Sequence, residues 1–160
     1  MNAVRILGAD PGLLRTGLGV VEARGGHCVF VGTTAVLPPA NRPLAERLAV
    51  ICAATQHFIA QQQPDVMVVE KLIYVRNAKV ALMLGHARGA LLLAAARSGL
   101  TVVDYTPREV KLAVSGNGAA SKQQVQRMVQ SILALDTPPT PEDVADALAL
   151  AICHAHRQGH

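Results

Sequence analysis

Residues 4–36 of this chain read VRILGADPGLLRTGLGVVEARGGHCVFVGTTAV, and this stretch decides the fold. It contains three apolar runs rich in β-branched residues or glycine, at 4–9, 16–23 and 28–36. An Asp-Pro-Gly segment ends the first run, and an Arg-Gly-Gly-His segment separates the second from the third. Segments of this composition are typical of turns, so the pattern predicts three strands joined as an antiparallel meander.

The rest of the chain alternates between apolar residues at helical spacing and short apolar runs. Three prolines at 38, 39 and 43 precede the first helical pattern, and the run at 66–69 is continuous enough for a strand covered on both faces. The expected helices are 44–61, 77–97, 107–114, 121–135 and 141–156, and the expected strands are 66–69 and 100–105. The order βββαβαβααα predicts a single α/β domain over residues 1–160, a mixed five-stranded sheet with helices on both faces.

Composition excludes several classes of protein. Hydrophobic residues make up 51% of the 160 and charged residues only 16%, which excludes a disordered chain. The three cysteines lie far apart without a C-x-x-C pair, which argues against a zinc ribbon or a disulfide framework and favours a reducing cytoplasm. The uncharged stretch 89–96 is too short to span a bilayer, and the start lacks a secretory signal pattern, so we expect a cytoplasmic protein without a membrane partner. The net charge of +4 is compatible with a polyanionic ligand but does not establish one.

Two acidic residues stand at the ends of predicted strands. Asp10 follows the first strand and Glu70 follows the fourth. Ligands of open α/β sheets bind beyond the carboxyl ends of the strands, so the two carboxylates would share one edge if their strands are neighbours. Asp10 could also be a plain turn residue, and Glu70 a surface acid at the end of a strand.

Two further acids, Asp143 and Asp146, are three residues apart on the last predicted helix, and therefore lie on one face with Cβ atoms roughly 5–6 Å apart. The segment 140–143 (TPED) matches a capping box, which alone would account for Asp143. Asp146 lies a turn deeper, on the side of Ala147 and Leu150. A buried carboxylate without a partner is costly or becomes protonated, and a divalent cation would remove that cost. A structural Asp satisfied by hydrogen bonds is the alternative.

These four carboxylates predict a metal-dependent nuclease. Carboxylate oxygens suit Mg²⁺ or Mn²⁺ better than Zn²⁺, which prefers cysteine and histidine ligands. The rival set of metal-ligating residues, Cys153, His154 and His156, points in different directions on a helix, so we interpret it as an ordinary helix end.

The order of these motifs resembles the RuvC family of bacterial Holliday junction resolvases. The segments that carry the resemblance are GADPG (8–12) with TGLG (16–19), VE (69–70), RNA (76–78), LGHARG (84–89) and DVADALA (143–149). The resemblance covers about residues 5–156. It implies a ribonuclease-H-like fold and a homodimer that nicks two strands of a four-way DNA junction, together with branch-migration helicase machinery as a partner.

The same resemblance assigns roles to residues. It implies that Asp10, Glu70, Asp143 and Asp146 bind two Mg²⁺ ions, with Mn²⁺ as a substitute, and that hydrolysis leaves 5′-phosphate and 3′-hydroxyl ends. It also implies that Lys111 and Lys122 contribute to DNA binding or catalysis, with Lys122 stabilising the charged transition state. From spacing alone, both lysines could equally lie on a solvated helix face.

One departure from the family concerns base stacking. Family members can carry a phenylalanine three residues after the glutamate, whereas this chain has Ile73, with Tyr74 beside it as a candidate replacement or as a partly buried loop residue. Arg76, Lys79 and Arg88, on or near the long helix, are candidate phosphate contacts. The G-x-x-x-G pattern at 85–89 would allow close approach of a second subunit's helix or, equally, packing on the chain's own sheet.

Three other functions are alternatives for a sequence of this kind. A ribonuclease-H-like nuclease acting on another nucleic acid, such as an RNA–DNA hybrid, needs the same acids, because acids do not specify the substrate. An ATP-binding domain of the actin and sugar-kinase type needs two related domains, for which 160 residues are too few. A catalytically inactive nucleic-acid-binding module is disfavoured because all four acids are present.

Overall fold

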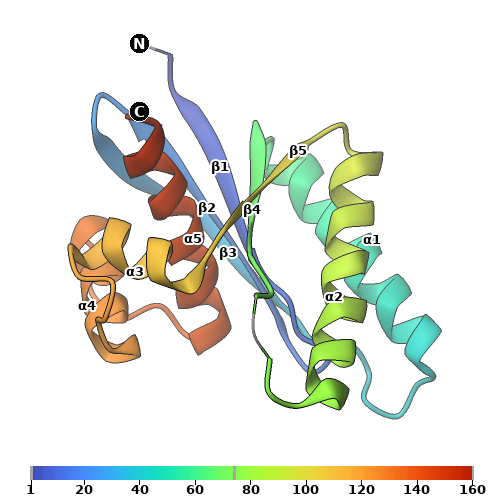
Figure 1. The fold of residues 1–160 in the computed structure, drawn as a ribbon. Coiled ribbons are helices and arrows are strands. Elements are labelled where there is room, and N and C mark those ends of the chain that lie inside the picture. Colours follow the sequence, from blue (N-terminus) through green and yellow to red (C-terminus); the bar gives the residue numbers. More distant parts are fainter. Residues whose placement is uncertain (1, 74, 160) are drawn as a thin grey trace.

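The computed structural model describes residues 2–73 and 75–159, and in this part of the chain five strands form one sheet that helices cover on both faces (Figure 1). The strands are β1 (Val4–Asp10), β2 (Thr16–Arg24), β3 (His27–Val36), β4 (Val66–Glu70) and β5 (Thr101–Tyr105). The helices are α1 (Leu44–Gln62), α2 (Ala78–Arg97), α3 (Pro107–Ser115), α4 (Lys122–Ile132) and α5 (Glu142–Gln158). The predicted order of elements and the α/β class are confirmed.

The strand order β3-β2-β1-β4-β5 makes β1 the centre of the sheet. β1, β2 and β3 pair antiparallel, as the turn residues predict, whereas β4 runs parallel to both β1 and β5. Because β1 and β4 are parallel neighbours, Asp10 and Glu70 end their strands at the same edge of the sheet. That edge is the lower end of the molecule in Figure 1.

Side chains alternate between two cores along each central strand. On β1, Leu7 and Ala9 belong to the core under α1 and α2, whereas Ile6 belongs to the core under α3, α4 and α5. β4 follows the same rule, with Met67 and Val69 in the first core and Val66 and Val68 in the second. Continuing this period of two, Asp10 and Glu70 project from the α5 face. The hydrophobic pattern therefore decides on which side of the sheet the acids lie.

Helix α2 is long and apolar enough to cross a membrane when only its length and composition are considered. In this fold it packs on the sheet and against α1, with Ala87, Leu91, Ala94 and Ala95 buried. A core helix of an α/β domain passes the same test of length and composition, so this feature is weak support for a membrane span.

The start of α5 differs from the prediction. The N-cap residue is Pro141, which makes no side-chain capping bond, and the helix begins at Glu142. The capping box predicted for residues 140–143 is therefore wrong, because the helix starts one residue later than the pattern indicated. As a result, Asp143 does not cap the helix, and its carboxylate is turned toward Arg15.

Candidate active site

Glycines on the strands bring α5 down onto the sheet. Gly8 on β1 and Gly17 on β2 both face the helix, and a Cβ atom at either position would collide with α5 backbone. At Gly8 the obstacle is the carbonyl oxygen of Ala147, and at Gly17 it is the carbonyl of Asp143. The first two turns of α5 therefore rest directly on strand backbone, beside the end of β1. Since Gly17 also pairs with Asp10, this contact sets Asp143 close to the acid of the central strand.

Three of the four predicted acids line one pocket of about 260 Å³ at this edge of the sheet. Asp10 and Glu70 come from the strand ends, and Asp146 comes from the second turn of α5. The two predicted lysines, Lys111 of α3 and Lys122 of α4, line the same pocket. The remaining wall is largely apolar and consists of Pro107, Val110, Val125, Ala149 and Leu150.

The fourth acid, Asp143, lies next to this pocket and not in its lining. Its Oδ2 atom is 3.5 Å from a guanidinium nitrogen of Arg15, a residue of the loop between β1 and β2. The expectation that all four carboxylates point into one pocket therefore holds for three of them. Asp143 remains near enough to raise the pKa of Asp10 by its charge.

Burial and like charge perturb the carboxyl groups of the pocket. Burial, followed by the charges of Asp146, Asp143 and Glu70, raises the pKa of Asp10 to about 8. Burial is also the main cause of a raised pKa at Glu70, and the charge of Asp146 adds to it. Burial and mutual repulsion therefore both disfavour the charged forms of Asp10 and Glu70 when no cation is bound.

Lys122 supplies part of the missing positive charge. Its Nζ atom lies 3.0 Å from Oδ2 of Asp146 and 3.4 Å from Oε1 of Glu142. Burial alone would lower the pKa of Lys122, but the hydrogen bonds and charges of Asp146 and Glu142 together outweigh it, so the pKa is raised. Burial still raises the pKa of Asp146 despite this lysine. A single ammonium group therefore offsets only part of the acidic charge.

The donor set fits a hard divalent cation in its chemistry. Carboxylates from two strand ends and one helix turn provide oxygen ligands, and burial followed by their mutual repulsion raises their pKa values, two effects that a bound cation would oppose. Among residues 2–73 and 75–159, however, no three acidic, histidine or cysteine side chains are spaced to hold an ion as they stand. Two of the acids are turned toward Arg15 and Lys122, so these side chains would have to rotate for a cation to bind.

The predicted phosphate contacts are in different environments. Arg76 and Lys79 are exposed in the segment between β4 and the first turn of α2. Arg88 instead donates a 2.8 Å hydrogen bond to Asp104 of β5, and only 20% of its side chain is exposed. A phosphate contact by Arg88 would have to break this internal ion pair. Tyr74 lies outside the described residues, and its neighbour Ile73 is 63% exposed.

The histidine and cysteine residues near the end of α5 make separate contacts. The Nδ1 atom of His154 lies 2.9 Å from the hydroxyl of Tyr105, whereas Nδ1 of His156 lies 2.8 Å from the carbonyl oxygen of Ala113. Burial raises the pKa of Cys153 to about 12, so its thiol stays protonated. These contacts agree with the interpretation of this segment as an ordinary helix end.

Sequence reasoning missed two charged residues of the site. Arg15 follows the Asp-Pro-Gly turn by three residues, and Glu142 precedes Asp143 directly, so both positions were visible in the sequence. Their roles depend on partners more than a hundred positions away, or on another helix, and no local pattern signals them.

The fold and the pocket together define the class. A mixed sheet whose central strand and parallel neighbour both end in an acid, beneath a helix that carries two more, is the arrangement of a ribonuclease-H-like nuclease. A model of the family "Crossover junction endodeoxyribonuclease RuvC" matches residues 6–154. This chain belongs to the RuvC family.

Individual relatives agree with this assignment. The protein of that name from Moorella thermoacetica is 51% identical over 150 residues, which is 94% of this chain and 90% of the relative. The one from Mycobacterium avium is 50% identical over 155 residues, or 96% of this chain and 82% of the relative.

Solved structures show the same architecture. T. thermophilus RuvC in complex with Holliday junction substrate matches with a TM-score of 0.92 and 35% identity, over 97% of this chain and 94% of that one. The yeast mitochondrial Holliday junction resolvase Ydc2 matches with a TM-score of 0.68 but only 11% identity, a likeness of fold alone.

Proposed function

We propose that this chain is a single-domain, divalent-cation-dependent endonuclease that resolves four-way DNA junctions by paired symmetric nicks. The observation that carries the proposal is the pocket at the end of β1 and β4, where Asp10, Glu70 and Asp146 face Lys111 and Lys122. Acids at these positions can hold cations, and the lysines can meet the phosphate of a DNA strand. Membership of the RuvC family supports junction DNA as the substrate.

The residues that would hold the cations are the four acids. When bound, two Mg²⁺ ions, or Mn²⁺ in their place, supply activation of a water for in-line attack and stabilisation of the leaving 3′-oxygen. Asp10 would be the ligand nearest to both groups of acids, because it ends the central strand between Glu70 on β4 and the acids of α5. Because the bond between phosphorus and the 3′-oxygen would break, the products would carry a 5′-phosphate and a 3′-hydroxyl.

Lys122 is the candidate for electrostatic stabilisation of the transition state at the reacting phosphate. Its ammonium group sits in the acidic pocket and keeps its charge, because Asp146 and Glu142 raise its pKa. A fixed positive charge beside the reacting phosphorus favours the transition state over the ground state. Lys111 lines the same pocket and can bind an adjacent phosphate of the same strand.

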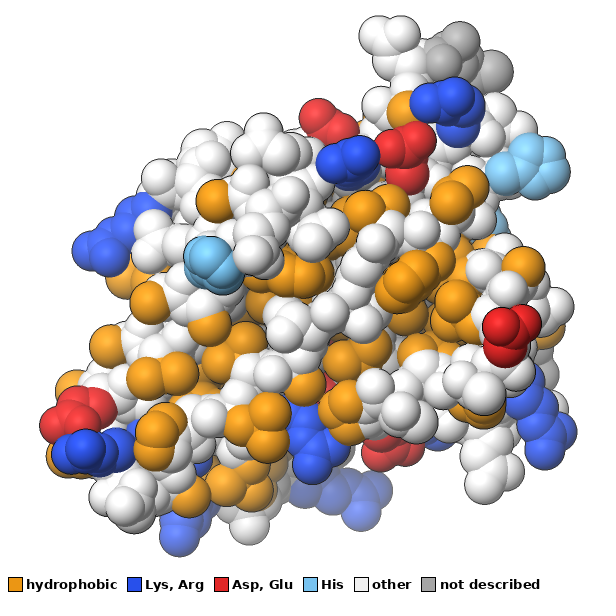
Figure 2. Space-filling view, turned by 180° about the vertical axis from the view of Figure 1, so that it is seen from behind, with side chains coloured by type: hydrophobic (Ala, Val, Ile, Leu, Met, Phe, Trp, Pro, Cys, Tyr) orange, Lys and Arg blue, Asp and Glu red, His pale blue; other side chains and the backbone are white. Residues whose placement is uncertain are grey.

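The DNA would approach the edge of the sheet that carries the acids. Lys and Arg side chains lie along this lower edge of the molecule in Figure 2, and the exposed Arg76 and Lys79 belong to the segment that leads from Glu70 into α2. In the same segment Leu72 and Ile73 are 40% and 63% exposed, so apolar side chains stand where the family carries its stacking residue. Stacking by Tyr74 stays a prediction, as does a phosphate contact by Arg88.

A homodimer is proposed because paired nicks on a two-fold symmetric junction need two identical sites. The outer side of α1 and α2 supports it, since apolar side chains such as Leu44 of α1 and Val80 of α2 are exposed there. Leu82 and Leu93 of α2 are 62% and 47% exposed. Gly85 and Gly89 have open space where a Cβ would be, so within this chain the glycine pair does not pack on the sheet. An apolar groove between α1 and α2 runs beside both glycines.

A nuclease assay tests the proposed function directly. Four-way junction, linear duplex and RNA–DNA hybrid of matched sequence are offered with Mg²⁺ and, separately, with a chelator. We expect symmetric nicks in the junction only, with Mg²⁺ only, and products that DNA ligase reseals without prior phosphorylation. Cleavage of the hybrid in place of the junction would move the assignment to another ribonuclease-H-like nuclease. The cytoplasmic location and a branch-migration helicase partner belong to the same proposal, and pull-down on junction DNA tests the partner.

A further inference from the structure

The loop between β1 and β2 holds a basic residue against the site. Arg15 lies at the end of this loop, and its guanidinium is 3.5 Å from Oδ2 of Asp143. The loop backbone is fixed on both sides of its turn. The hydroxyl of Thr16 donates to the carbonyl of Gly12 at 2.8 Å, and Arg47 of α1 donates to the carbonyl of Leu13 at 2.6 Å. Arg15 is therefore a side chain with an exposed tip on a rigid support.

The partner of Arg15 is equally fixed. Gly17 of β2 lies against the backbone of Asp143, so no side chain separates the first turn of α5 from the strand that follows the loop. The ion pair itself is loose. Its 3.5 Å separation is longer than that of a charge-assisted hydrogen bond, and 43% of the Arg15 side chain and 33% of the Asp143 side chain are exposed. Exposed pairs of this kind are weak and are readily replaced by a better partner.

We propose that Arg15 is an exchangeable counter-ion and positioning residue: it holds Asp143 when no cation is bound, and turns to a DNA phosphate when a cation takes Asp143. This inference rests on the proposed function. A divalent cation among several carboxylates outcompetes one loose guanidinium, which is then repelled by the cation. Because Arg15 follows Asp10 by five positions in a fixed loop, the released guanidinium remains at the rim of the site. There it can donate hydrogen bonds to a phosphate of the bound DNA strand.

Lys122 pairs with Asp146 in the same way as Arg15 pairs with Asp143. With no cation bound, each of the two predicted metal ligands on α5 thus has a basic partner. The two partners come from different elements, α4 and the loop after β1. Each carboxylate is thus turned to a basic side chain, and among the described residues no three potential ligands are spaced to hold an ion.

The first experiment measures cation binding without DNA. Mn²⁺ is titrated into wild type, Arg15→Gln and Arg15→Lys by calorimetry. We expect Arg15→Gln to bind Mn²⁺ roughly 2- to 5-fold more tightly, because a competing charge is gone. Arg15→Lys, which keeps the charge, should stay close to wild type. Unchanged or weaker binding in Arg15→Gln would overturn the counter-ion role, whether or not the protein cleaves junctions.

The second experiment measures the exchange. Junction binding is followed against monovalent salt, once with a chelator and once with Ca²⁺, whose looser coordination differs from that of Mg²⁺. With Ca²⁺, the slope of log affinity against log salt should be shallower in Arg15→Gln than in wild type by about 0.9 for each subunit bound. With the chelator the two slopes should agree. Equal differences under both conditions would mean a constant phosphate contact and would refute the exchange.

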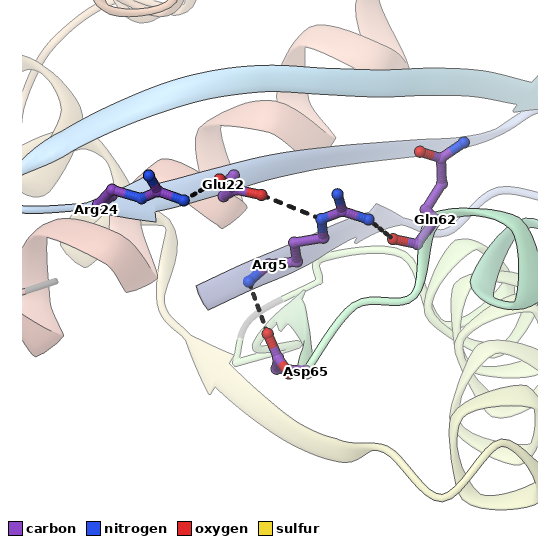
Figure 3. Close-up of polar contacts among 5 residues, drawn as sticks. All are labelled: Arg5, Glu22, Arg24, Gln62 and Asp65. Atoms are coloured by element: carbon purple, nitrogen blue, oxygen red, sulfur yellow. Dashed lines mark hydrogen bonds and ion pairs between the residues drawn. The ribbon is translucent and has the colours of Figure 1, made fainter. Parts of the chain in front are cut away.

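A matched control exists at the other end of the sheet. Arg24 pairs with Glu22 at 3.4 Å, a distance similar to that of the Arg15 pair, and Figure 3 shows this pair beside Arg5. Arg5 pairs with Glu22 at one end of the β1–β2 ladder, whereas Asp10 pairs with Gly17 at the other. Arg24→Gln should change neither Mn²⁺ affinity nor the slope with Ca²⁺. A change as large as that of Arg15→Gln would assign the effect to net charge and would sink the proposal. Thermal melts of all variants confirm that each protein is folded.

Discussion

The hydroxyl of Tyr105 lies 2.9 Å from Nδ1 of His154, and this buried contact joins the end of β5 to the last turns of α5. Arg157 stacks over the same ring, 5.4 Å from its centre. Tyr105 precedes the residues of α3 that line the acidic pocket. The contact therefore ties the helix that carries two acids to the strand that leads into the pocket wall.

Replacing Tyr105 by phenylalanine should lower the free energy of unfolding by about 1–3 kcal/mol, because a buried nitrogen of His154 loses this partner. Urea denaturation measures the effect. Cleavage at a temperature where both proteins are folded should change little, since the hydroxyl does not line the pocket. A free energy of unfolding equal to that of wild type would show that this hydrogen bond makes no net contribution to stability.

Asp146→Asn should reduce cleavage by about 10²–10³-fold or more, because the variant loses a charged ligand and the partner that orients Lys122. Junction binding in chelator should remain, because the exposed basic residues are untouched. Single-turnover nicking and a gel-shift assay measure the two effects. The control is Glu142→Gln, which removes the weaker contact of Lys122 at 3.4 Å and should leave nicking within a few-fold. Near-normal nicking by Asp146→Asn would contradict the role of this acid.

Asp10→Asn should stabilise the cation-free protein at pH 8. The folded-state pKa of Asp10 is about 8, whereas the unfolded value is about 3.9, so the folded state holds more protons between these values. The free energy of unfolding therefore falls as pH rises from about 4 to about 8, and the stabilising contribution is lost above that window. Asp10→Asn should flatten this decline.

Melting temperatures at pH 5 and pH 8 in chelator measure the Asp10 effect. Asp136→Asn is the matched control, because Asp136 is an exposed acid and its substitution should leave the wild-type pH dependence in place. A residual slope in Asp10→Asn is expected, since the pKa values of Glu70 and Asp146 are raised as well. A slope as steep as that of wild type would show that Asp10 is not the group responsible.

Gly8→Ala should lower the free energy of unfolding by about 1–3 kcal/mol or more, because its methyl group would meet the carbonyl oxygen of Ala147. Displacing α5 should also reduce cleavage, since the helix carries two acids. Gly118→Ala is the control. There a Cβ would meet only the flexible side chain of Arg108, so stability should change by less than about 0.5 kcal/mol. Equal changes in the free energy of unfolding at the two glycines would contradict the direct contact of α5 with the backbone of β1.

Leu82→Glu should dissociate the proposed homodimer, because it places a charge on the exposed apolar side of α2. Sedimentation velocity should show a shift from dimer to monomer, while circular dichroism stays that of the folded chain. Val29→Glu, at a position that is 59% exposed on β3, is the control and should leave the dimer intact. A monomeric wild-type protein would end the dimer proposal irrespective of the variant.

Much of the fold follows from local pattern. Turn residues at 10–12 and 24–27 predict the meander, and the apolar run of β4 predicts a strand covered on both faces, whose pairing with β1 the structure supplies. The position of three acids at one edge then follows from strand ends and helical spacing. These features depend on near neighbours in the sequence, so they are visible without a structure.

Other features depend on contacts between distant segments. The pairing of Asp143 with Arg15 and of Arg88 with Asp104 arises only after the sheet has assembled. The glycines at 8 and 17 stood out in the sequence as part of a motif, but their direct contact with α5 backbone did not. The segment TPED has the composition of a capping box that begins at Thr140. In the structure, however, Pro141 is the N-cap residue and the helix begins one residue later than this pattern predicts.

The direct seating of α5 on two strand glycines restricts how this site can adapt to its ligands. A helix separated from a sheet by side chains can slide or tilt by repacking them, but at Gly8 and Gly17 no side chain lies between the two backbones. We therefore expect the acids to regroup by torsions about Cα–Cβ and Cβ–Cγ bonds, which interconvert far faster than helices shift. Adjustment of the ligand shell should therefore be quick, local and independent of any change in the scaffold.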